Sequence, residues 1–201
     1  MRVLSDDPAP KNYGRCLLDA TVIPGDRLKF KIVDAWLVTK PIQSNKIKED
    51  ISGIIFGYAR YTKKALKRRG KIDCYIAERF MPRGGSGTVQ HGEAINFMLC
   101  SNILAMLGKN VDCKLIPAVS WKTQIKRYYD LGQLYKDIRP CPEHLLDATL
   151  IGLYMVYFKA GIKPYSTLSP KDIYRIKARL LDIGGRIKEK EDDKKKSKTK
   201  S

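Results

Sequence analysis

Three acidic residues that lie far apart in the chain are candidates for one divalent-metal site. Asp7 ends a short strand-like pattern (MRVLSDDP), Glu78 follows another (IDCYIAERF), and Asp147 lies in the apolar segment EHLLDATLIGLY. Carboxylate oxygens are the hard ligands that Mg²⁺ and Mn²⁺ prefer, and two such ions can serve phosphodiester hydrolysis. Taken singly, an aspartate before a proline, such as Asp7, is also typical of a turn. A glutamate at the end of a strand, such as Glu78, is often simply solvated. Together the three predict a hydrolytic metal site.

The strand and helix periods decide which carboxylates face inward. Adjacent residues of a strand point to opposite faces, so Asp6 and Asp7 separate, and Pro8 at the strand tip favours Asp7 as the metal ligand. His144 precedes Asp147 by one helical turn, and apolar residues continue the same face of that helix. A carboxylate on so apolar a face is costly unless a cation compensates it. Asp6 remains the alternative to Asp7.

The elements that must position these residues form an alternating pattern. Period-two stretches and turn residues predict strands at residues 2–6, 14–22, 27–39, 72–77 and 111–119. Apolar residues at helical spacing predict helices at 47–69, 93–107, 143–158 and 169–181. Ser169 is the expected N-cap of the last helix. The order predicts an α/β fold with a central sheet.

Composition restricts the partners of the chain. Its 201 residues carry a formal charge of +18, and the segment 186–201 holds eight Lys or Arg and four Asp or Glu. The preceding 185 residues therefore keep +14, which favours a polyanionic partner such as nucleic acid. The five cysteines lack metal-site spacing and are expected to be core residues in a reducing compartment. Without a signal region or an apolar span, we expect an intracellular protein of the cytoplasm or nucleoid (host cytoplasm if viral), neither secreted nor membrane-bound.

The order of the motifs resembles the RuvC-type Holliday junction resolvases of the RNase H-like nuclease superfamily. VLSDDPAPKNYG resembles their first strand, IAERF the second acidic strand, GGSGTVQHGEAIN the following loop and helix, and HLLDATLIGLY the closing helix. The resemblance implies a five-stranded mixed sheet flanked by helices, over residues 1–160. A helical extension (161–185) and a disordered Lys-rich tail (186–201) would follow.

The resemblance also implies a function. It implies a homodimer that resolves four-way DNA junctions by paired nicks in recombination and repair, with two Mg²⁺ or Mn²⁺ ions in each active site. Asp7, Glu78 and Asp147 would be the metal ligands, and His144 would assist the metals or orient the attacking water. Two features depart from the pattern: Asp6 stands where an apolar residue is usual, and the segment 121–142 is short.

Basic and aromatic residues that flank the acids are the candidates for DNA contact. These candidates are Arg79, Phe80, Arg83, Lys122, Lys126 and Arg127. Phe80 is as compatible with core packing as with a wedge between bases. The loop with Gly84, Gly85 and Gly87 lacks the lysine of a nucleotide-binding P-loop. The helix at 93–107 is apolar nearly all round, so it belongs in the core or in a dimer interface.

Two alternatives stay open. The same fold and acids would serve a nuclease that cuts flaps, branched replication DNA or RNA–DNA hybrids. A catalytically inert DNA-binding protein is the alternative from another class.

Overall fold

A five-stranded mixed sheet forms the centre of the computed structural model, which describes residues 1–8, 13–25, 27–38, 51–67, 69–79, 86–106 and 110–198. Its strands are β1 (Arg2–Asp7), β2 (Gly14–Ile23), β3 (Arg27–Leu37), β4 (Cys74–Arg79) and β5 (Asp112–Pro117). They lie in the order β3-β2-β1-β4-β5, in which β3, β2 and β1 are antiparallel neighbours and β4 and β5 continue parallel to β1. The predicted α/β class and sheet are confirmed.

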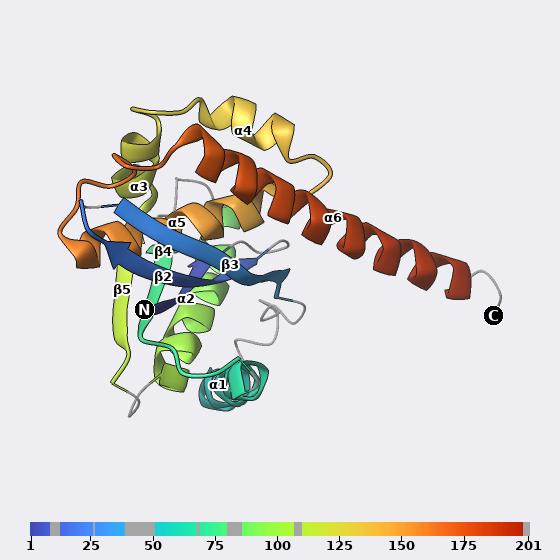
Figure 1. Ribbon diagram of the computed structural model, residues 1–201. Coiled ribbons are helices and arrows are strands. Elements are labelled where there is room, and N and C mark those ends of the chain that lie inside the picture. The colour runs from blue at the N-terminus through green and yellow to red at the C-terminus, as the bar shows by residue number, and fades with distance from the viewer. Residues whose placement is uncertain are drawn as a thin grey trace.

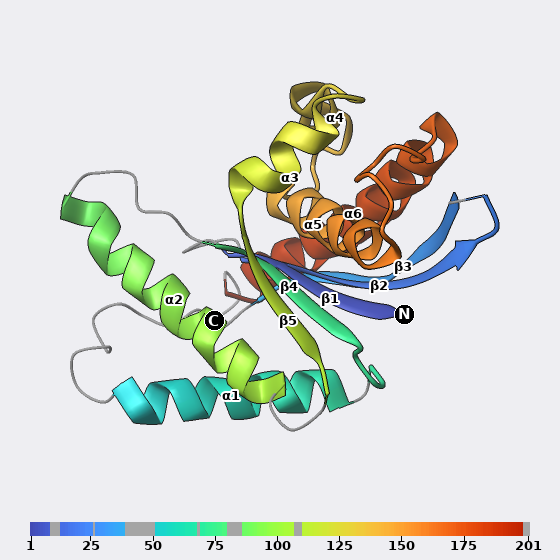
Figure 2. The same cartoon turned by 90° about the vertical axis from the view of Figure 1, so that its left-hand side faces the viewer.

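Helices cover both faces of this sheet. They are α1 (Ile51–Lys67), α2 (Ser86–Met106), α3 (Ala118–Ile125), α4 (Leu131–Asp137), α5 (Glu143–Ala160) and α6 (Pro170–Lys198). Figure 2 shows α1 and α2 on one face and α5 and α6 on the other. Figure 1 shows α6 passing over β3 and continuing beyond the end of the sheet. Among the described residues no helix is long and apolar enough to cross a membrane.

Side-chain alternation along β1 divides the core into two layers. Val3 packs in the large cluster beneath α5, whereas Leu4 packs in a second cluster with residues of α2. Both side chains are fully buried. This is the period-two pattern predicted for residues 2–6, and it assigns Ser5 and Asp7 to the α5 face and Asp6 to the α2 face.

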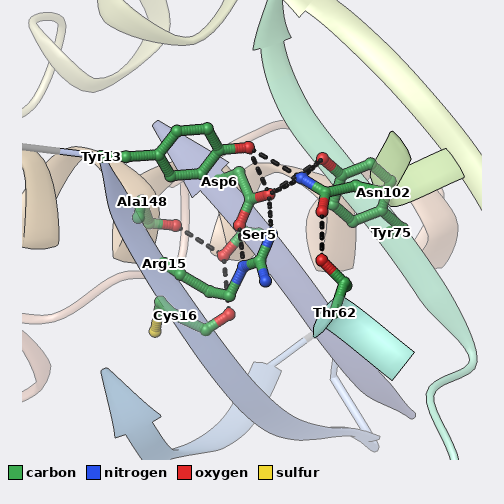
Figure 3. Close-up of polar contacts among 9 residues, drawn as sticks. All are labelled: Ser5, Asp6, Tyr13, Arg15, Cys16, Thr62, Tyr75, Asn102 and Ala148. Atoms are coloured by element: carbon green, nitrogen blue, oxygen red, sulfur yellow. Dashed lines mark hydrogen bonds and ion pairs between the residues drawn. The ribbon is translucent and has the colours of Figure 1, made fainter. Parts of the chain in front are cut away.

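Helix α5 packs against β1 and β2 where glycines leave no room for a side chain. A Cβ atom on Gly152 would lie 2.5 Å from Leu18 Cδ1 and 2.6 Å from Ser5 Oγ. The Ser5 hydroxyl donates a hydrogen bond of 2.7 Å to the Ala148 carbonyl of the helix, as Figure 3 shows. At the other end, a Cβ on Gly14 would lie 2.1 Å from the His144 carbonyl oxygen. These contacts fix the height and direction of α5 over the sheet.

The last helix differs from its predicted end. We expected it to stop near residue 181, but α6 continues to Lys198. The disorder expected from residue 186 stays a prediction. Lysine and glutamate, which dominate this segment, are good helix formers, so the absence of apolar residues does not end the helix. The predicted N-cap is confirmed: the Asp172 amide donates to Ser169 Oγ at 3.2 Å, and the Ser169 amide donates to Asp172 Oδ2 at 3.1 Å.

Other boundaries are also corrected. Helix α2 begins at Ser86, so Gly87 is helical, and Gly84 and Gly85 lie outside the described residues. Helices α3 and α4 occupy a segment for which no helix was predicted, and β5 ends at Pro117 rather than at residue 119. The cysteines are free, but Cys100 and Cys113 are exposed, which corrects the expectation that all five are core residues.

The close contact at Gly152 yields a stability prediction. Gly152→Ala should lower the free energy of unfolding by about 1–3 kcal/mol, because the added methyl group has no room against Leu18 and Ser5. Gly57→Ala, at an exposed position of α1, is the matched control and should raise stability by up to about 1 kcal/mol, since open space surrounds that position. Urea unfolding measures both. Equal effects of the two substitutions would contradict the packing argument.

Candidate active site

Two of the predicted acids lie at the same edge of the sheet. Strands β1 and β4 are parallel neighbours, so their carboxyl ends meet there, with Asp7 the last residue of β1 and Glu78 the next-to-last of β4. The first turns of α5 lie over this edge, because Gly14, the β2 partner of Asp7, lets the helix approach. The fold therefore brings His144 and Asp147 to the same place.

Short hydrogen bonds hold two of these acids. Asp7 Oδ2 lies 2.5 Å from His144 Nδ1, and the Asp7 carboxylate is almost entirely buried. Glu78 Oε2 accepts a 2.9 Å hydrogen bond from the indole nitrogen of Trp121, whose side chain is fully buried in α3. Each carboxylate is thus fixed by an aromatic or imidazole N–H rather than by solvent.

The third acid has two partners. Asp147 Oδ1 accepts a 2.7 Å hydrogen bond from the Tyr135 hydroxyl of α4, and Asp147 Oδ2 lies 3.3 Å from Lys122 Nζ. The Asp147 side chain is 9% exposed, and that of Lys122 is 34% exposed. Lys122 also lies over the ring of Trp121, at 5.0 Å from its centroid. Lys122 therefore supplies a positive charge inside the acidic cluster.

Burial and mutual repulsion make the carboxylates hard to ionise. Desolvation raises the pKa of Asp147 to about 6, and the charge of Asp7 adds to the effect. Desolvation likewise raises the pKa of Asp7, with a contribution from Glu78, and that of Glu78, with a contribution from Asp147. Because each acid responds to another's charge, the three belong to one electrostatic cluster.

The pKa values of the two basic groups are also raised, and for a base this shift favours the charged form. The hydrogen bond to Asp7 raises the pKa of His144. Burial opposes the charge of Lys122, but Asp147, Glu78 and Asp7 together raise its pKa. One ammonium and one imidazole group thus compensate three carboxylates.

Asp6, the alternative ligand, has a different environment. Its buried carboxylate accepts two 2.7 Å bonds from the guanidinium of Arg15, a fully buried side chain, as Figure 3 shows. It also accepts hydrogen bonds from Tyr13 (2.7 Å), Tyr75 (2.9 Å) and Asn102 (3.0 Å). A carboxylate so fully used by protein donors is structural, and the geometry favours Asp7 as the acid of the cluster.

The donor atoms of the cluster are carboxylate oxygens, the type of ligand that a divalent ion such as Mg²⁺ prefers. Among the residues that the structure describes, no three His, Cys, Asp or Glu side chains are gathered closely enough to hold one ion. The carboxylates instead contact Lys122, His144, Trp121 and Tyr135. Asp7 and Asp147 are buried, Glu78 is half-buried, and all three have a raised pKa, so a hard cation nearby would relieve their repulsion.

The predicted DNA-contacting residues divide into three groups. Arg79, Lys126 and Arg127 are exposed at or after the ends of β4 and α3, the elements that carry Glu78 and Trp121. Lys122 contacts Asp147, which makes it part of the acidic cluster. Phe80 and Arg83 lie outside the described residues.

Trp121 and Tyr135 each donate a hydrogen bond to a carboxylate of the cluster, a role that the sequence alone did not predict. Trp121 follows the β5 strand pattern closely, and its indole N–H near a strand end could have indicated a hydrogen-bond donor to the site. Tyr135 lies in α4, a helix that the sequence analysis did not predict, so nothing placed its hydroxyl near Asp147.

Comparison with known proteins supports the fold. No protein-family model and no curated protein sequence matches the chain. The structure of Thermus thermophilus RuvC is similar, with a TM-score of 0.56 and 17% identity over 82% of this chain and 99% of that chain. For T. thermophilus RuvC in complex with a Holliday junction substrate, the TM-score is 0.55 and the identity 17%, over 80% of this chain and 97% of that chain. For the yeast mitochondrial Holliday junction resolvase Ydc2, the TM-score is 0.46 and the identity 14%, over 92% of this chain and 84% of that chain. The two RuvC structures show that the chain has a RuvC-like fold.

Adjacent aspartates of β1 should respond oppositely to removal of their charge. Asp6→Asn should cost about 3–5 kcal/mol of unfolding free energy, because Arg15 would keep an uncompensated buried charge. Asp7→Asn should cost little, since burial already disfavours its ionised form. Urea unfolding compares the two variants. A larger loss for Asp7→Asn would show that Asp7 is the structural member of the pair.

The raised pKa of Asp147 predicts a pH-dependent stability. The folded state binds this proton more tightly than the unfolded chain does, so the ionised group costs stability at pH 7–8, and the cost fades as the pH falls through about 6 toward 4. In EDTA, Asp147→Asn should therefore be more stable than wild type by about 1–3 kcal/mol at pH 7.5, and the difference should shrink at pH 5. Unfolding at both pH values measures it; a destabilised variant at pH 7.5 contradicts this account.

Proposed function

We propose that this protein is a metal-dependent endonuclease that resolves four-way DNA junctions by paired nicks. The proposal rests on one observation: Asp7, Glu78 and Asp147, from β1, β4 and α5, lie at one edge of a RuvC-like sheet, and each has its pKa raised by burial and by the charge of another. Buried carboxylates that repel one another are expensive to maintain, and catalytic centres are where such arrangements occur.

The proposed chemistry is phosphodiester hydrolysis. Asp7, Glu78 and Asp147 would hold Mg²⁺ or Mn²⁺, proposed as two ions. When bound, these ions supply an activated water and stabilise the leaving oxygen. The indole of Trp121 and the hydroxyl of Tyr135 orient Glu78 and Asp147 from outside the cluster.

The two basic groups have separate proposed roles. His144 holds Asp7 through Nδ1 and, with its side chain about one third exposed, is placed to accept or deliver a proton on the solvent side. Lys122 compensates Asp147 and is the group that a bound cation would displace, because both satisfy the same negative charge. A displaced Lys122 would be free to contact a phosphate.

DNA is the substrate class that the charge distribution supports. The first 185 residues carry +14, and Arg79, Lys126 and Arg127 are exposed near the cluster. The T. thermophilus RuvC neighbour was determined with a Holliday junction substrate. We extend that substrate to this chain, with Phe80 and Arg83 as further DNA contacts proposed from the sequence. A homodimer is proposed because two symmetric sites suit paired nicks in a near-symmetric junction.

Cleavage of matched DNA substrates tests the function. With Mg²⁺, the wild-type protein should nick a four-way junction at paired positions and cut flap, RNA–DNA hybrid and linear duplex substrates at least roughly tenfold more slowly. Asp7→Asn, Glu78→Gln and Asp147→Asn should each reduce cleavage by about 10³-fold or more while DNA binding persists, because each removes a proposed metal ligand. Gel mapping of the nicks measures the rates.

Asp19→Asn is the matched control, because Asp19 is a half-exposed carboxylate that pairs with Arg2 on the sheet, outside the cluster. It should cut at the wild-type rate. Preferential cleavage of flaps or hybrids would assign the site to another branched or hybrid substrate. Absence of cleavage on every substrate, with no effect of Mg²⁺ on stability, would leave a DNA-binding protein without catalysis.

A further inference from the structure

A second charged surface lies where α6 runs along β3, which is an edge strand of the described sheet. We call this contact line the β3–α6 seam. One hollow of about 460 Å³ opens along it, lined by Phe30, Lys31, Ile32, Arg175 and Arg179. A second, of about 240 Å³, has Trp36, Arg69, Ile183 and Arg186 among its lining residues. Both hollows therefore combine an apolar wall with cationic side chains.

The cations of the seam outnumber its acids. Five cations line the two hollows: Lys31, Arg69, Arg175, Arg179 and Arg186. Their carboxylate partners are Asp34, Asp172 and Asp182, and Asp182 is shared by Arg179 (2.7 Å) and Arg186 (3.1 Å). Arg175, Arg179 and Arg186 are 37–63% exposed, and ion pairs this exposed contribute little stability, so these three guanidinium groups can turn to an incoming anion.

The spacing of the arginines suits a linear polyanion. Arg175, Arg179 and Arg186 are four and seven residues apart, so they share one side of α6. At the rise of an α-helix they span about 16 Å, over which one DNA strand presents about five phosphates. The helix then continues to Lys198, and residues 187–198 hold six Lys and four Asp or Glu, which add a net charge of +2.

The seam leads toward the acidic cluster. Gly14 pairs with Asp7 on one side and with Leu37 on the other, so the end of β3 lies two strand spacings, roughly 10 Å, from Asp7. Helix α6 passes this end in close contact: a Cβ on Gly184 would lie 2.8 Å from the Cα of Cys141, which immediately precedes the segment that begins α5.

We propose that the β3–α6 seam binds the phosphate backbone of a duplex arm and directs that arm to the acidic cluster. The catalytic part of this statement rests on the proposed nuclease function, whereas the binding part does not. Charge complementarity selects DNA as the occupant, because apolar side chains in the hollows alternate with arginines instead of forming a continuous patch.

Equilibrium binding in EDTA tests the seam without cleavage. The probes are a labelled four-way junction and a labelled linear duplex, titrated with full-length protein over a range of salt concentrations. The test variant is Lys31→Gln with Arg175→Gln, which leaves the contact of Arg179 with the Val33 carbonyl intact. The control is Lys63→Gln with Lys64→Gln, which removes the same charge from two exposed positions of α1, on the opposite face of the sheet.

The seam variant should bind both probes about tenfold or more weakly, and the slope of log affinity against log salt should decrease by about 2. The control should change affinity less than about threefold. Equal losses in both variants, no loss in the seam variant, or no DNA binding by wild type would overturn the proposal. Arg175→Gln with Arg186→Gln repeats the test without altering β3, should Lys31→Gln affect folding.

Two further readouts separate this proposal from its alternatives. If the seam variant changes the molecular mass in solution, by light scattering, and not DNA affinity, the seam is a protein interface and the proposal fails. Cleavage by the wild-type protein is then compared with binding. If the seam variant loses DNA affinity but the wild-type protein cuts no substrate, only the proposed nuclease function is contradicted. If the wild-type protein cuts DNA but the seam variant binds DNA as well as wild type does, only the proposed role of the seam is contradicted.

Discussion

Neighbouring side chains of a strand must point to opposite faces, and β1 uses this constraint to give two adjacent aspartates different environments. Asp6 faces α2 and is neutralised by Arg15 within a fully buried network. Asp7 faces α5 and shares a cluster with other acids. A shift of one residue in the register of β1 would exchange the two carboxylates, so the register of this strand determines the whole site.

The position of α5 depends on the same strand. Ser5, which shares a face with Asp7, hydrogen-bonds the Ala148 carbonyl, and Gly14 and Gly152 let the helix descend onto the sheet. Asp147 is therefore carried to Asp7 by backbone packing and not by attraction between the two acids, which repel. The stability of the core supports a locally unfavourable arrangement of charge, as is common at functional sites.

The sequence predicted the parts of this structure that depend on local periodicity. Alternation in β1 separated Asp6 from Asp7, and the apolar face of α5 placed Asp147 inward, because both follow from strand and helix geometry. Trp121, Tyr135 and the contact of Lys122 with Asp147 depend on tertiary placement of α3 and α4, which no periodicity announced. The predicted end of α6 at residue 181 was wrong for a related reason. A segment rich in charged residues is expected to be exposed to solvent, but its composition does not indicate that the helix ends.

Helix α6 also protects the fold. An uncovered edge strand exposes a row of backbone donors and acceptors that can recruit another chain, and α6 shields β3 from that fate with Ile176, Leu180 and Ile183 buried against the core. The first half of α6 therefore packs on the sheet, and its second half, which is rich in charged residues, continues beyond the sheet. Loss of the half that packs on the sheet would uncover β3 and favour aggregation, whereas changes in the charged half beyond the sheet should leave the sheet intact.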